Sequence, residues 1–164
     1  MNSRKIAVYG LMTALAMVLS YVEAMVPVSL GVPGAKLGLP NMVTMVALYT
    51  VGARAAFSLS LLRIVLVGLS FGNPFAAFYS FCGFLLSFAV MVLMKRSRAF
   101  GILGVSAAGG VMHNVGQLIC AAVLVKTGYV FTYLSVLLPA GVIAGVLIGI
   151  LGGILTKRLK GFIL

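Results

Sequence analysis

Acidic residues are almost missing from this chain of 164 residues, which has no aspartate and a single glutamate, Glu23. One carboxylate can form neither an acidic magnesium cluster nor a pair of carboxylates for general acid and base catalysis. With His113 as the only histidine, the sequence also excludes a Ser–His–Asp triad and offers no zinc site. It contains no P-loop motif, so the chain cannot hydrolyse ATP. We therefore predict a protein that is not an enzyme and that uses no metal or cofactor.

Charged residues of both signs make up only 8% of the chain, against 63% hydrophobic residues. Ordinary globular proteins carry roughly a quarter charged residues. The twelve Lys and Arg residues give a net charge of +11, but they separate long apolar runs and form no contiguous patch. This pattern is typical of a multi-span membrane protein and argues against nucleic-acid binding. Cys82 and Cys120 lie inside apolar runs without a CxxC motif, which favours buried, inert thiols.

Hydropathy and turn residues predict an all-α integral membrane protein, a single domain over residues 1–164 with six transmembrane helices. A helix needs about 20 residues to cross roughly 30 Å of hydrocarbon. The first apolar run loosely resembles a secretory signal, but further spans follow, so we interpret it as an uncleaved membrane helix. The predicted spans are residues 5–26, 38–53, 54–71, 75–94, 101–125 and 131–156.

The charges between these spans predict the orientation of the chain. If the N-terminus is cytoplasmic, the outside segments hold only Lys36 and Lys126. The inside segments then hold Arg4, Lys5, Arg54, Lys95, Arg96, Arg98, Lys157, Arg158 and Lys160. Because basic residues concentrate on the cytoplasmic side, we predict a multi-pass protein of the cell membrane with both termini inside.

Small residues predict two close helix contacts. The last span has glycine at every fourth position from Gly141 to Gly153, and we expect this groove to pack within the chain. The first span carries a small-xxx-small pair, Gly10 and Ala14, which we interpret as a docking surface for a partner helix.

The connection between the first two spans, residues 26–41, is rich in proline and glycine. It is either a simple connector or a lid over an outward-facing pocket. Lys36 and Asn41 flank the entrance to the second span. A snorkelling anchor accounts for Lys36 without a ligand, but not for Asn41.

Arg63 lies nine residues beyond Arg54, roughly 13 Å along a helix at about 1.5 Å per residue. It is therefore near the centre of the bilayer, where an arginine needs a partner. The partner can be a carboxylate, backbone carbonyl groups, water or an anionic ligand. Glu23 is the only carboxylate available for a direct pair, and we favour a ligand.

A second polar group falls at the same depth, in the stretch GGVMHNVGQ (109–117). His113 and Gln117 are four residues apart and share a helix face, with Asn114 beside them. A lone histidine in an apolar helix is usually structural, but polar side chains at this depth commonly line a cavity. The turn after the third span adds Asn73 and the aromatic residues Phe71, Phe75, Phe78, Tyr79 and Phe81, which form either an interfacial belt or pocket walls.

Four segments together carry a family resemblance: PGAKLGLPN (33–41), LLRIVLVG (61–68), SFCGFLLS (80–87) and GGVMHNVGQ (109–117). They resemble the Gx transporter family, whose members often carry the label heptaprenyl diphosphate synthase component I. The resemblance extends over about residues 5–155. That family is similar to the substrate-binding S-components of energy-coupling factor (ECF) transporters. The resemblance implies six helices, a gating loop after the first helix, and a small-residue face that docks a coupling protein driven by two ATPases.

These observations predict an S-component-like subunit for uptake of a small polar or anionic molecule, held in the lipid bilayer and energised by separate subunits. The predicted binding residues are Lys36, Asn41, Arg63, Asn73, Tyr79, His113, Asn114 and Gln117. The alternative is a non-catalytic membrane accessory of a polyprenyl diphosphate synthase or of a redox complex. A stand-alone facilitator is a third interpretation.

Overall fold

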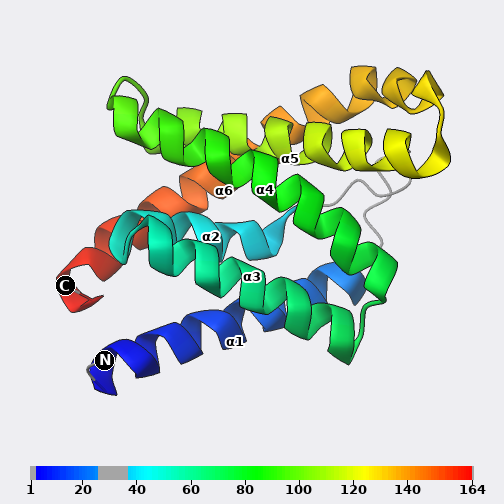
Figure 1. Ribbon diagram of the computed structural model, residues 1–164. Helices are drawn as coiled ribbons and strands as arrows, with labels where there is room; N and C mark the ends of the chain where they lie inside the picture. Colours follow the sequence, from blue (N-terminus) through cyan, green and yellow to red (C-terminus); the bar gives the residue numbers. More distant parts are fainter. Residues whose placement is uncertain (1–2, 26–36, 164) are drawn as a thin grey trace.

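The computed structural model describes residues 3–25 and 37–163 as a bundle of helices (Figure 1). The described residues form α1 (Ser3–Met25), α2 (Leu39–Thr50), α3 (Ala53–Ser70), α4 (Pro74–Ser97), α5 (Ile102–Val125), the 3₁₀ turn η1 (Gly128–Tyr133) and α6 (Leu134–Ile163). Within this part of the chain, five of the six α-helices are long and apolar enough to cross a membrane. The predicted all-α fold and multi-pass membrane location are therefore confirmed.

The exception is α2, which corrects the predicted second span of residues 38–53. This helix has 12 residues and is about 18 Å long, little more than half of the roughly 30 Å hydrocarbon core. Backbone geometry limits both of its ends, because Gly38 and Gly52 have φ values of 75° and 99° that other residues rarely adopt. The N-terminal end of α2 lies near the middle of the bundle's length (Figure 1).

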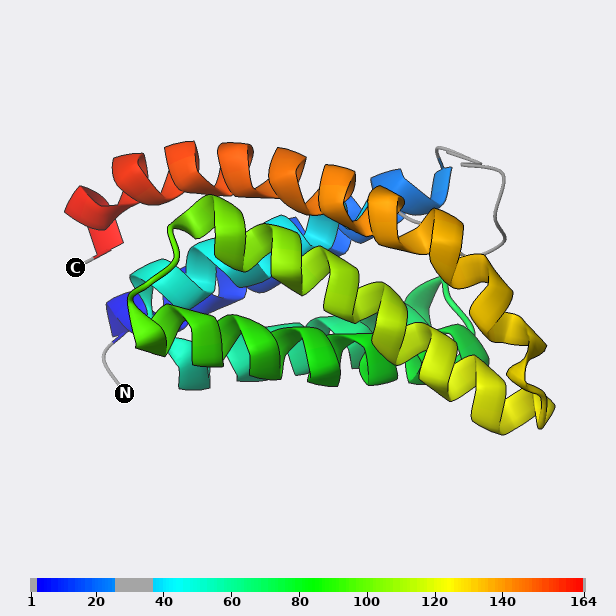
Figure 2. The same cartoon turned by 90° about the horizontal axis from the view of Figure 1, so that it is seen from above.

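The start of α1 and the end of α6 lie at the same end of the bundle (Figure 2). That end also holds the start of α3 and the turn between α4 and α5, so the basic positions of the predicted inside segments gather there. Lys126 caps the other end of α5, at the opposite end of the bundle. The predicted separation of charge is present along the helices, and the side of the membrane that each end faces stays a prediction.

Glycines join α4, α5 and α6 at short range. A Cβ atom added at Gly110 would lie 2.3 Å from the Gly141 carbonyl oxygen, and one added at Gly145 would lie 2.6 Å from the Ser106 carbonyl oxygen. Such contacts with backbone atoms mean that α5 and α6 touch without intervening side chains. The prediction that the glycine groove of the last span packs within the chain is confirmed.

Side chains from other helices hold both ends of α2. At its N-terminus the Glu23 carboxylate of α1 accepts hydrogen bonds from the backbone N–H groups of Gly38 and, at 3.3 Å, Leu39. At its C-terminus Lys95 of α4 donates to the Leu48 carbonyl oxygen and lies 4.8 Å from the centre of the Tyr49 ring. An anion at the N-terminus and a cation at the C-terminus both suit the helix dipole.

Candidate functional site

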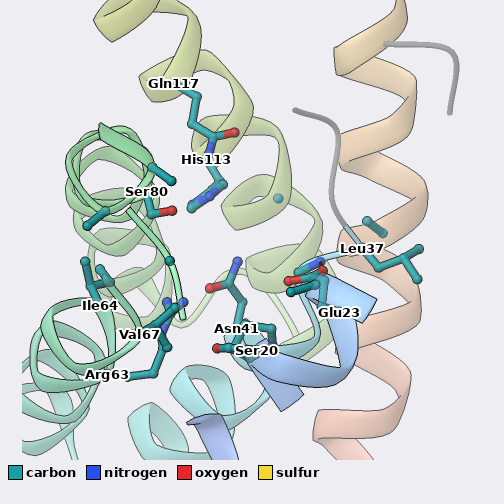
Figure 3. A pocket seen from close by; sticks show the side chains of 18 of the residues that line it. Ser20, Glu23, Leu37, Asn41, Arg63, Ile64, Val67, Ser80, His113 and Gln117 are labelled. Carbon is teal, nitrogen blue, oxygen red and sulfur yellow. Dashed lines mark hydrogen bonds between the residues drawn. The ribbon is translucent and has the colours of Figure 1, made fainter. Parts of the chain in front are cut away.

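A cavity of about 140 Å³ lies where the six helices meet (Figure 3). It is located toward the end of the bundle away from the basic residues, because the last turns of α1, the turn Phe71–Gly72 and the first turns of α4 line it. The polar side chains among the described lining residues are Ser20, Glu23, Asn41, Arg63, Ser80, His113, Asn114 and Gln117.

Arg63 is the buried cation of this cavity. It is 7% exposed, and its Nε atom has no hydrogen-bond partner within the described ranges. In Figure 3 its guanidinium group extends from α3 toward the space between Asn41 and His113. An unpaired charged donor in an apolar interior is costly, so this side chain has strong unused capacity to bind an acceptor.

Glu23 does not form the direct ion pair with Arg63 that was one of the alternatives open in the sequence. Its Oε1 atom is instead occupied by the first backbone N–H groups of α2. Both charged side chains nevertheless line the same cavity. The structure therefore separates the two charges and directs both toward one space.

The glycines around His113 explain how the polar side chains of α5 fit beside the cavity. Gly110 packs against the backbone of α6, while Gly116 packs against the Cys82 carbonyl oxygen of α4. On α4, a Cβ atom at Gly83 would lie 2.8 Å from Gln117 Cγ and 3.0 Å from His113 Cε1. These glycines leave room for the two side chains between closely packed helices.

Asn114 lines the cavity but also has a structural bond. Its Nδ2 atom donates to the Leu137 carbonyl oxygen of α6 at 2.7 Å. Only the remaining donor and acceptor capacity of this amide can serve a ligand.

Of the other predicted site residues, Asn41 lines the cavity and two do not. Asn73 is exposed and caps α4, where its Oδ1 atom accepts a hydrogen bond from the Ala76 N–H at 2.7 Å. Its position before Pro74 at the first turn of a helix explains this role. Tyr79 is half-buried outside the cavity lining. Lys36 lies outside the described residues, as does most of the predicted lid.

The prediction omitted several lining residues. Ser20 and Glu23 are three residues apart, a spacing that places both on one face of the first helix and could have identified them. Ser80, a polar candidate in the sequence that was left out of the predicted set of binding residues, also lines the cavity. Of the aromatic residues after α3, Phe71 is part of the lining, whereas Phe75 and Phe78 are 64% and 52% exposed, as residues of an interfacial belt would be.

Comparison with curated proteins and with solved structures finds no match. A family model does match, over residues 12–155, which begin in α1 and end in α6. The family is described as heptaprenyl diphosphate synthase component I, and the chain belongs to it.

Proposed function

We propose that this protein is the substrate-binding membrane subunit of an uptake system, similar to an ECF S-component, for a small polar or anionic molecule. The main support for the proposal comes from Arg63, a buried cation that faces a polar cavity. Its Nε atom has no hydrogen-bond partner in the described part of the chain. Charge-assisted hydrogen bonds from an arginine to an anionic group are among the strongest that a binding site can offer. Binding without catalysis agrees with a sequence that has one carboxylate.

The size of the cavity supports a small ligand. At about 10–15 Å³ for each water molecule, a volume of about 140 Å³ has room for roughly ten. A ligand of similar bulk is smaller than a typical drug molecule, and a heptaprenyl chain is far too long for this space. If the chain serves an isoprenoid pathway, this cavity volume favours a small ligand over the long-chain product.

The position of the cavity supports uptake from outside. The charge pattern predicts that the chain crosses the membrane six times with both termini in the cytoplasm. In that orientation the basic end of the bundle would face the cytoplasm and the cavity would lie in the outer half. The short α2 begins at the cavity, as half-length helices of transporters commonly begin at a binding site, and the Glu23 carboxylate binds its N-terminus. Gly10 and Ala14 are both exposed on α1, which suits docking of a coupling protein that is driven by separate ATPases.

The binding proposal is tested with a matched pair of variants on α3, Arg63→Gln in the cavity and Arg54→Gln, which is exposed at the basic end. Each removes one guanidinium group from the same helix. The purified protein is screened against short carboxylates, amino acids and phosphate esters by thermal shift, and hits are measured by calorimetry. We expect a ligand that binds the wild type and Arg54→Gln equally but binds Arg63→Gln at least about tenfold more weakly. The proposal fails if no compound stabilises the wild type, or if both variants bind alike.

The family's description supports a second candidate, a membrane accessory of a prenyl diphosphate synthase. Affinity purification from native membranes separates the two functions. Recovery of ATPase subunits with the protein supports uptake, whereas recovery of a soluble prenyl synthase without ATPases supports the accessory role.

A further inference from the structure

Opposite charges face the cavity from two different helices without pairing. Arg63 of α3 and Glu23 of α1 both line it, and no ion pair joins these two described residues. The Oε1 atom of Glu23 accepts two backbone hydrogen bonds, while Oε2 has no hydrogen-bond partner in residues 3–25 and 37–163. Each charged group therefore keeps unused hydrogen-bonding capacity toward a shared space.

The charge balance of this space discriminates between ligands. One guanidinium and one carboxylate cancel, so a simple anion bound at Arg63 would leave an excess negative charge within the bundle. Uncompensated charge at membrane depth is costly. A ligand with one positive and one negative group adds no net charge and gives a partner to both Arg63 and Glu23.

Asn41 occupies the position between the two charges. In Figure 3 its side-chain amide lies between the Arg63 guanidinium and the Glu23 carboxylate. An amide has both a donor and an acceptor, so it can donate to an anionic group and accept from an ammonium group of the same molecule. The site thus offers complementary contacts to both poles of a short dipolar molecule.

We propose that the ligand is a small zwitterion of the amino-carboxylate class, with its carboxylate on Arg63 and its ammonium group on Oε2 of Glu23. This inference rests on the proposed function and specifies its substrate class. The α5 and α4 side chains His113, Gln117 and Ser80 form the neighbouring wall and contact the remainder of the molecule. The cavity volume of about 140 Å³ suits a free amino acid.

The test uses sets of probes that share one carbon skeleton. Each small L-amino acid is compared with the carboxylate that lacks the amino group and with the amine that lacks the carboxylate; one such set is leucine, 4-methylpentanoate and 3-methylbutylamine. Affinities for the detergent-purified full chain are measured by calorimetry and thermal shift. We expect at least one amino acid to bind, and both of its partial analogues to bind about tenfold more weakly or worse.

The variant Glu23→Gln sharpens the test, because glutamine keeps an acceptor oxygen for the α2 backbone while removing the charge. It should weaken binding of the amino acid by about tenfold. It should also strengthen binding of the matching carboxylate, because the excess negative charge in the cavity is gone, so the preference for the amino acid is lost. Arg54→Gln is the control and should change neither affinity.

The outcomes separate this inference from the proposed function. If carboxylates bind the wild type as tightly as amino acids, or if Glu23→Gln leaves the amino acid affinity unchanged, the zwitterion assignment is wrong while anion binding at Arg63 stands. If neither amino acids nor anions bind, both proposals fail. The comparison of probes on the wild type needs no variant, so it decides the question even if Glu23→Gln does not fold.

Discussion

The bundle has two halves that are held together by different means. In the half formed by α4, α5 and α6, glycines bring backbone against backbone, as at Gly110 and Gly145. In the half formed by α1, α2 and α3, side chains fill the space between the helices, and buried apolar residues such as Met45 and Leu48 form most of the core. Polar side chains add connections: Glu23 binds one end of α2, and the hydroxyl groups of Thr44 and Ser60 lie 2.7 Å apart. The cavity lies between the halves, so one wall is fixed by close packing and the other carries both charges.

The largest loss of stability should follow from a substitution that forces the closely packed helices α5 and α6 apart. Gly110→Ala places a methyl group 2.3 Å from the Gly141 carbonyl oxygen, and backbone atoms cannot move aside as a flexible side chain can. We expect a loss of about 2–3 kcal/mol, measured as a lower unfolding midpoint of the purified protein. Gly104→Ala, on the same helix, meets Phe100 only at 3.7 Å and should not lose stability. Equal effects of the two variants would show that backbone contact does not hold this half together.

A variant at the cavity wall of the other half should gain stability instead of losing it. Arg63→Met replaces a buried guanidinium that has an unsatisfied Nε atom with a shorter, unbranched apolar side chain. Without ligand the desolvation cost of the guanidinium group disappears, but Glu23 loses the positive charge that balances it. The net gain in stability should therefore be modest, about 1–2 kcal/mol, while ligand binding is lost. Unfolding midpoints of the ligand-free protein measure the gain, with the exposed Arg54→Met as the control. A loss of stability in Arg63→Met would instead assign the arginine a structural role.

Removing the side chain that binds either end of α2 should cause a smaller loss of stability. Glu23→Ala removes the acceptor for the first backbone N–H groups of the helix and should cost about 1 kcal/mol. Lys95→Met removes the donor to the Leu48 carbonyl oxygen and should cost a similar amount, about 1 kcal/mol. The two sites are separated by the length of the helix, so the losses should add in the double variant. A double variant with a clearly smaller loss than this sum would show that α2 is released as one unit when either end is freed.

The same difference between the halves explains what the sequence could predict. Periodic glycines report helix packing directly, so the groove from Gly141 onward was identified as an internal contact. Depth along a helix placed Arg63 and His113 near one another, and both line the cavity. The role of Glu23 could not be predicted, because it depends on where α2 begins, and that is fixed by the backbone conformation of Gly38. The short length of α2 was missed because an apolar run does not reveal such a boundary.

The smallest effects, on ligand affinity, should come from removing one of two neighbouring hydroxyl groups of α4. The two variants test which face of α4 forms the wall of the cavity. Tyr79→Phe and Ser80→Ala each remove one hydroxyl, but only Ser80 lines the cavity. Tyr79→Phe should therefore leave ligand affinity unchanged, whereas Ser80→Ala should weaken it by a factor of about 3–10, the loss of roughly one hydrogen bond. Calorimetry on both variants with the same ligand makes the comparison. If Tyr79→Phe weakens binding more than Ser80→Ala, the ligand contacts the other face of α4, and the wall of the site is not the one that faces Arg63.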